Sequence, residues 1–171
     1  MNRSQMSFNS RGGGEMIKLV RVDHRLIHGQ VALTWTNAIN ADCILVANDD
    51  ILDDPVQKTT LKLAAPHNVK VVIKSIEDSI EAINDGKTDK YKLFIVTKTI
   101  ADAHRLAQKV DQINKINIGS VKEAPGSSAL THTVFVSDED RSELNSMVAE
   151  GFHVFAQQVP TDKAVDLSKL L

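Results

Sequence analysis

The stretch from Ile17 to Trp35 constrains the fold most, because it reads as a strand that runs directly into a helix. Residues 17–22 are mostly apolar and include β-branched side chains, a composition typical of a strand. A polar turn over residues 23–30 follows, and then an amphipathic helix that carries Val31, Leu33 and Trp35. This order predicts a strand–turn–helix unit, with the start of the helix at the carboxyl edge of a sheet.

The same alternation continues along the chain. Further strands are predicted at residues 43–47, 70–73, 91–96, 113–118, 131–136 and 152–157, and helices at 55–64, 76–84, around 103–110, 137–150 and 161–171. The continuous apolar run at 43–47 is typical of a parallel strand that is covered on both faces. We therefore predict an α/β fold: an open, mainly parallel, twisted sheet of about six or seven strands with helices on both faces.

A length of 171 residues fits one domain with a substantial core, and the sequence contains no internal repeat. Residues 1–15 are rich in Ser, Asn, Arg and Gly and end in three consecutive glycines. We predict that they are a flexible leader or a remnant of expression, and that residues 16–171 form the folded domain.

Charge and composition exclude several classes of protein. A formal net charge of −2 gives no general attraction to nucleic acid or to an anionic membrane. The sequence has neither an apolar stretch of the roughly 20 residues that span a bilayer nor a signal peptide, which predicts a cytoplasmic protein. The single cysteine, Cys43, lies in an apolar run and is expected to be a buried structural thiol.

The turn before the first helix has the residues of an anion site. The first N–H groups of a helix lack intrahelical partners, and the helix dipole is positive there. Arg25 adds a planar guanidinium that binds phosphate oxygens, and His28 adds an imidazole that can form a phosphohistidine. Gly29 and Gln30 then provide further donors to phosphate. We therefore predict that Arg25 holds a phosphoryl group that His28 carries.

Each of these residues also has a simpler interpretation. A histidine alone is more often packed at a helix start, and Arg25 could pair with Asp23 or Asp49 at the surface. We expect Asp23 to orient Arg25 or the loop backbone, with a turn-forming role as the alternative. Gln30 could instead be a solvated residue in the first turn of the helix.

Other residues have weaker signals. Thr97, Lys98 and Thr99 could line the phosphate site if their strand lies beside the first; alternatively, Thr97 or Thr99 could cap a helix, with Lys98 solvated. The spacing of His24 and His28 is disfavoured as a metal site because a turn separates them. Trp35 is expected in the core. The remaining histidines are expected to be structural or exposed: His67, His104, His132 and His153.

The segment Val22-Asp23-His24-Arg25-Leu26-Ile27-His28-Gly29-Gln30-Val31 resembles the phosphorylation loop of enzyme IIB in the mannose/fructose/sorbose class of the bacterial sugar phosphotransferase system. The resemblance covers almost the whole chain after Met16, including residues 46–50, 117–119 and 133–137. Residues 159–161 and 164–167 are similar to the N-acetylgalactosamine/galactosamine branch.

The resemblance implies a function and partners. His28 would be phosphorylated on Nδ1 by a phosphohistidine of enzyme IIA, and would pass the group to a sugar imported by the membrane components IIC and IID. Arg25 would steady the phosphoryl group, and Asp23 would support the loop. No cofactor and no metal are implied. Two residues depart from the pattern of many relatives: His24 replaces an acidic residue, and Ser120 replaces a glycine.

A non-catalytic module that binds phosphate or a nucleotide is the alternative function. It would use the same helix start, without forming a covalent bond to the ligand. The sequence supports it less, because it contains neither a dinucleotide-binding glycine motif nor a Walker loop.

Overall fold

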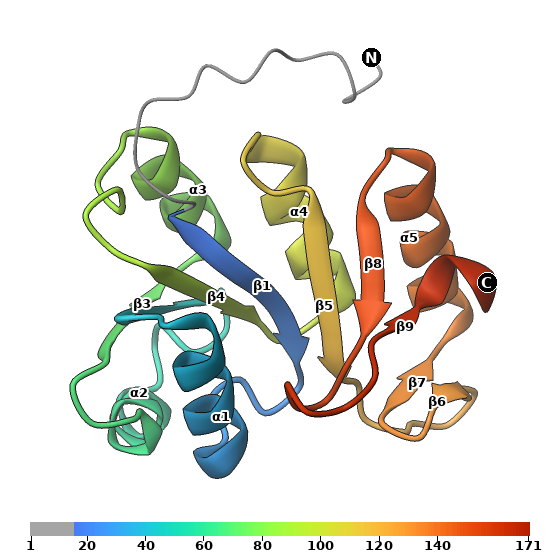
Figure 1. Cartoon of the computed structure of the whole chain (residues 1–171), viewed down its shortest axis with the longest axis horizontal. Coiled ribbons are helices and arrows are strands. Elements are labelled where there is room, and N and C mark those ends of the chain that lie inside the picture. The colour runs from blue at the N-terminus through green and yellow to red at the C-terminus, as the bar shows by residue number, and fades with distance from the viewer. Residues whose placement is uncertain (1–15) are drawn as a thin grey trace.

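The computed structural model describes residues 16–171, and the predicted leader at 1–15 lies outside the described residues. The main sheet contains β1 (Ile17–Asp23), β2 (Cys43–Ala47), β3 (Lys70–Lys74), β4 (Leu93–Thr97), β5 (Lys115–Ser120), β8 (His153–Ala156) and β9 (Val165–Asp166). Their order is β3-β2-β4-β1-β5-β8-β9, and each neighbouring pair is parallel except β8 and β9 (Figure 1). This confirms the predicted fold class.

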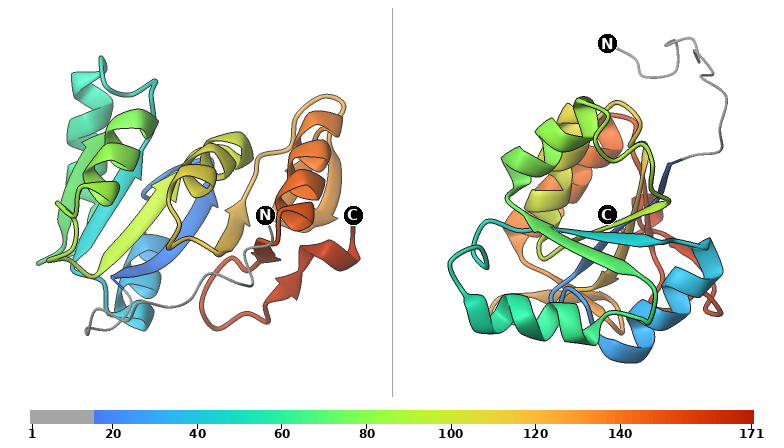
Figure 2. Two further views of the ribbon diagram at one scale, coloured as in Figure 1. Left: turned by 90° about the horizontal axis from the view of Figure 1, so that it is seen from above. Right: turned by 90° about the vertical axis from the view of Figure 1, so that its left-hand side faces the viewer.

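Five α-helices cover the sheet in two layers (Figure 2). Their bounds are α1 (Gly29–Ile39), α2 (Pro55–Ala64), α3 (Ile76–Asn84), α4 (Ile100–Lys109) and α5 (Asp138–Ala149). Trp35 of α1 and Leu61 of α2 pack in one apolar cluster, and α3, α4 and α5 share a second, larger one. The sheet is therefore buried on both faces. Within residues 16–171, no helix has both the length and the apolar character to cross a membrane.

Side-chain caps fix where several helices begin. Asp54 accepts a hydrogen bond from the backbone N–H of Gln57 at the start of α2, whose first residue is a proline. Ser137 and Asp140 form a reciprocal capping box at the start of α5. The predicted spans of α2 and α3, at 55–64 and 76–84, agree with the structure because these caps are local in sequence.

The strand order places a topological switch point between β1 and β4, where the helices that follow the two strands go to opposite faces of the sheet. β1 and β4 are neighbours, but α1 leaves β1 on one face while α4 leaves β4 on the other. At such a change of direction the carboxyl ends of the strands border an open space where ligands bind in α/β proteins. The loop after β1, which contains His28, lies at this edge.

Two predicted elements were wrong. The strand predicted at 131–136 is a hairpin of β6 (Ser128–Thr131) and β7 (Val134–Val136), which forms its own two-stranded antiparallel sheet. A turn at residues 132–133 interrupts the predicted span. The terminal helix predicted at 161–171 is instead β9 followed by the short 3-10 helix η2 (Leu167–Lys169). Here pairing with β8 overrides local helix propensity.

Two strands also begin later than predicted. β4 begins at Leu93 because the backbone N–H of Tyr91 bonds the Thr88 carbonyl in a turn. β5 begins at Lys115 because the N–H of Ile113 bonds the Val110 carbonyl in the same way.

Candidate phosphorylation site

A buried arginine underlies the loop after β1. Arg21 is 1% exposed, and its Nη1 donates to Asn117 Oδ1 at 2.7 Å and to the Gln157 carbonyl at 3.0 Å. Its Nη2 donates to Asp23 Oδ2 at 3.2 Å. Burial lowers the pKa of Arg21 and the Asp23 carboxylate raises it, with a net lowering from a value so high that the guanidinium remains charged. Arg21 thus places a fixed positive charge beneath the site.

Gly119 of β5 makes room for this guanidinium. A Cβ atom built on Gly119 would lie 2.0 Å from Arg21 Cζ, which is far inside van der Waals contact. A glycine is therefore required here by the close approach of a side chain from the neighbouring strand.

Asp23 connects the buried arginine to the loop. Its side chain is 1% exposed, and its Oδ1 accepts from the backbone N–H of Arg25 at 3.0 Å and from Arg25 Nε at 3.3 Å. Both roles predicted for Asp23, the turn-forming contact and the orientation of Arg25, are therefore present together. The turn also holds Leu26 at a φ of 61°, in the left-handed region.

His28 is exposed at the mouth of α1. It is the N-cap residue of the helix, but its side chain makes no capping hydrogen bond. Its Nδ1 lies 3.4 Å from Arg25 Nη1. Because a guanidinium only donates, this contact favours the tautomer in which Nδ1 carries a lone pair and Nε2 carries the proton. In that tautomer the Nδ1 lone pair faces a positive charge.

The first turn of α1 supplies open backbone donors. The first helical hydrogen bond of this turn runs from the N–H of Ala32 to the His28 carbonyl at 3.0 Å, so the earlier N–H groups have no partner within the helix. Gly29 and Gln30 are exposed, and a Cβ on Gly29 would meet nothing within 4 Å. The helix start beside His28 therefore has space and donors for an anion.

The structure does not bring Thr97 to this surface. β4 does lie beside β1, as the prediction required, but the Thr97 side chain is fully buried and its hydroxyl donates to the Thr99 carbonyl at 3.2 Å. Thr99, not Thr97, caps α4. Lys98 is half-buried at the same edge, and its phosphate-binding role stays a prediction.

His24 and Ser120 contact each other. His24 Nδ1 and Ser120 Oγ are 3.0 Å apart, and the backbone N–H of His24 donates to the Ser120 carbonyl at 3.1 Å. This pair fastens the loop to the end of β5. Within residues 16–171, no three His, Cys, Asp or Glu side chains are grouped to hold a metal ion.

Trp35 packs beneath the site, as expected for a core residue. It is 5% exposed, its Nε1 donates to the Gln158 carbonyl at 2.9 Å, and Arg21 Cζ lies 5.5 Å from the ring centroid. Arg21, Asn117, Gly119 and the Gln157 carbonyl were not predicted from sequence. The sequence signal for this buried part of the site was Arg21, a charged residue inside the strand predicted at 17–22.

A comparison with protein families matches residues 17–171 to the PTS system sorbose subfamily IIB component. The chain belongs to this family. The match covers every described strand and helix, including the loop that carries His28.

Individual relatives agree with this assignment. The chain is 37% identical over 155 residues to the N-acetylgalactosamine-specific phosphotransferase enzyme IIB component 2 of Escherichia coli, covering 91% of this chain and 98% of that protein. It is 34% identical over 162 residues to a probable phosphotransferase enzyme IIB component of Streptococcus pyogenes, covering 91% and 99%.

A solved structure shares the fold of this IIB component. The IIBSor domain of the sorbose permease from Klebsiella pneumoniae matches with a TM-score of 0.85 at 30% identity, covering 90% of this chain and 94% of that one. The protein is thus a phosphotransferase-system IIB component with a phosphotransferase role, as the resemblance predicted.

Proposed function

We propose that this IIB component carries a phosphoryl group on Nδ1 of His28, between a phosphorylated enzyme IIA and a sugar that the membrane components IIC and IID import. The contact between Arg25 Nη1 and the exposed His28 Nδ1 supports this proposal most directly. The similarity to N-acetylgalactosamine-specific relatives favours an amino sugar of that branch as the substrate. A cytoplasmic protein that docks on the membrane components fits this role.

The reaction needs only positioning and charge stabilisation from this chain. In the first step the Nδ1 lone pair attacks phosphorus, the new P–N bond forms, and the P–N bond to the IIA histidine breaks. In the second step a sugar hydroxyl attacks the same phosphorus, the hydroxyl proton is released to water, and the electron pair of the P–Nδ1 bond returns to His28. Nε2 keeps its proton throughout. Arg25 and the N–H groups of the first turn, with Gly29 and Gln30, bind the phosphoryl oxygens.

The buried residues of the site in turn hold the Arg25 side chain in position. Asp23 bonds the Arg25 side chain, and Arg21 bonds Asp23. A phosphoryl group that arrives at His28 therefore meets a guanidinium whose position is already fixed. We keep Lys98 as a candidate second cation and leave out the buried Thr97.

Intact-protein mass spectrometry after incubation with phosphorylated IIA tests the proposal. We expect the mass of one phosphoryl group, in an acid-labile and base-stable linkage, and no addition to His28→Ala. The control is His132→Ala, which changes an exposed histidine on another element and should be labelled normally. Unchanged labelling of His28→Ala would refute the site, and absent labelling of the native protein would favour reversible binding of phosphate or a nucleotide.

The role of Arg25 has its own test. Arg25→Ala should fold normally and transfer the phosphoryl group roughly 100-fold more slowly, the order of loss when one charge-stabilising donor is removed. Rapid-quench kinetics measure this rate. A native rate in Arg25→Ala would remove Arg25 from the mechanism.

A further inference from the structure

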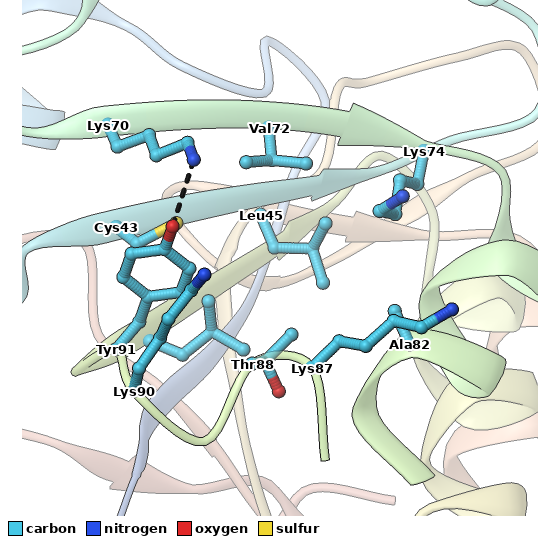
Figure 3. Close-up of a pocket in the computed structure, with 11 residues that line it drawn as sticks. Cys43, Leu45, Lys70, Val72, Lys74, Ala82, Lys87, Thr88, Lys90 and Tyr91 are labelled. Atoms are coloured by element: carbon cyan, nitrogen blue, oxygen red, sulfur yellow. Dashed lines mark hydrogen bonds between the residues drawn. The ribbon is translucent and has the colours of Figure 1, made fainter. Parts of the chain in front are cut away.

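A second surface feature lies on the α3 face of the sheet. A cavity of about 260 Å³ opens there over the first halves of β2 and β4 and along β3 from Lys70 to Lys74. It is lined by Cys43, Leu45, Lys70, Val72, Lys74, Ala82, Lys87, Thr88, Lys90, Tyr91 and Leu93 (Figure 3). Because α1 packs on the other face of the sheet, this cavity is separate from the loop that contains His28.

The cavity is basic at both ends. At one end Lys70 Nζ bonds the Tyr91 hydroxyl at 2.8 Å, and Lys70 and Lys90 each place Nζ 5.2 Å from the centroid of the Tyr91 ring. At the other end are Lys74 and Lys87, on the far side of Leu45 from Tyr91 (Figure 3). Four ammonium groups thus surround the opening, and no carboxylate is among the lining side chains.

These charges are mostly uncompensated. Lys87 forms an exposed pair with Asp85 at 3.9 Å. In the described part of the chain, no other ion pair includes a lysine of this cavity. A protein with a formal net charge of −2 therefore gathers four positive charges in one place. Such a concentration attracts an anionic partner and repels a cationic one.

The floor between the lysines is apolar. Leu45 and Leu93 form part of it, together with Val72 from the edge strand. The thiol of Cys43 also faces the cavity, but burial raises its pKa to about 11, so it is neutral and unreactive at physiological pH. The floor of the cavity thus offers an apolar contact surface and no reactive group.

Charge and size together favour one kind of occupant. The cavity volume of about 260 Å³ is close to the lower end of the range of about 300–1,000 Å³ that is usual for small-molecule sites. Its volume suits one large apolar side chain, with the lysines placed to meet charges on either side of it. We propose that this lysine-rimmed cavity docks an acidic segment of a partner protein, with an apolar side chain inserted between flanking carboxylates.

The lysines also have a simpler role, because charged side chains on an edge strand prevent sheets from pairing edge to edge. That role accounts for Lys70 and Lys74 on β3. It does not account for Lys87 and Lys90, which lie on the loop before β4, or for an apolar floor between the two pairs.

Fluorescence anisotropy with a labelled Glu-Asp-Phe-Asp-Glu peptide tests the proposal on the full chain. We expect binding that weakens at high salt, and that weakens about tenfold or more when serine replaces the phenylalanine. Lys70→Glu/Lys90→Glu should abolish binding. The matched control is Lys58→Glu/Lys62→Glu on α2, with the same change in charge on the other face of the sheet, which should bind nearly as the native protein does.

Three results would overturn the proposal: no binding by the native protein, equal loss in both double variants, or equal displacement of the peptide by inorganic phosphate at matched charge. Circular dichroism checks that both variants are folded. Phosphorylation of His28 by IIA should be unchanged in Lys70→Glu/Lys90→Glu, so this proposal can fail independently of the carrier function.

Discussion

At the scale of single residues, the site depends on a chain of alternating charges. Arg21 is buried and holds Asp23, Asp23 holds Arg25, and Arg25 contacts His28. The His28 imidazole is exposed, yet Arg21 and Asp23, which hold Arg25 beside it, are buried. A change at the buried end should therefore affect both stability and phosphoryl transfer.

Gly119→Ala tests this directly. The new methyl group would displace the Arg21 guanidinium from its partners, leaving buried charges without compensation. We expect a loss of about 3–5 kcal/mol in the free energy of unfolding, measured by urea denaturation, and slower phosphoryl transfer. Gly29→Ala adds the same group in open space and should change stability by less than about 1 kcal/mol. Equal stability of the two variants would contradict the packing argument.

The pair formed by His24 and Ser120 gives a second prediction. Ser120→Ala should lower the free energy of unfolding by about 1 kcal/mol through loss of one side-chain hydrogen bond. In a double-mutant cycle, the variant with both Ser120→Ala and His24→Ala should lose less free energy of unfolding than the two single variants lose in sum. Additive losses would mean that the two side chains do not interact in solution.

At the scale of elements, a histidine joins two helices on the side of the sheet away from α1. His104 of α4 is 4% exposed, with Glu143 of α5 at Nδ1 and Glu150, just after α5, at Nε2, the latter at 2.9 Å. A carboxylate at each ring nitrogen favours the imidazolium, the form in which both nitrogens donate. Burial lowers the pKa of His104, but the hydrogen bonds and charges of Glu150 and Glu143 outweigh it and raise the pKa overall.

The sign of the pH dependence follows from this raised pKa. The stabilisation from His104 is complete below the pKa of histidine in the unfolded chain, about 6.5. It is lost as the pH rises through the pKa of His104 in the folded protein. His104→Gln should therefore destabilise the protein by about 1–3 kcal/mol near pH 6 and by less at pH values above the folded pKa. Urea denaturation at several pH values measures the difference. The exposed His153→Gln is the control, and a pH-independent difference for His104→Gln would contradict the prediction.

The elements also show what sequence alone can predict. The loop from Asp23 to Gln30 and the capped helices were predictable because their hydrogen bonds join residues two to four positions apart. Arg21 meets Asn117 and Gln157 across 96 and 136 positions, and only the register of β1, β5 and β8 brings them together. The hairpin at 128–136 and the edge strand β9 were missed for the same reason, since tertiary pairing decided their structure.

At the scale of the whole molecule, the two apolar clusters lie on opposite faces of one sheet and share its strands. The β2 and β4 strands contribute buried residues to both, and β1 contributes buried residues to the larger cluster and the half-buried Leu19 to the other. Neither layer of helices can then lose its packing without exposing the strands that the other layer covers. The domain should unfold as one cooperative unit.

The single tryptophan makes this prediction measurable. Trp35 reports on the α1 side, next to Arg21 and Gln158, whereas far-ultraviolet circular dichroism reports on all helices. The midpoints of urea denaturation by the two probes should coincide. A lower midpoint for Trp35 fluorescence would mean that the face carrying the phosphorylation loop opens first.

The hydrogen bond from Arg21 to the Gln157 carbonyl spans most of the chain. During synthesis, β1 and its loop leave the ribosome long before residue 157 does. An incomplete chain would contain His28 and Arg25 but would leave one donor of the buried guanidinium without its acceptor. We therefore expect the arrangement of Arg21, Asp23 and Arg25 beneath His28 to be complete only once the chain has been synthesised past residue 157.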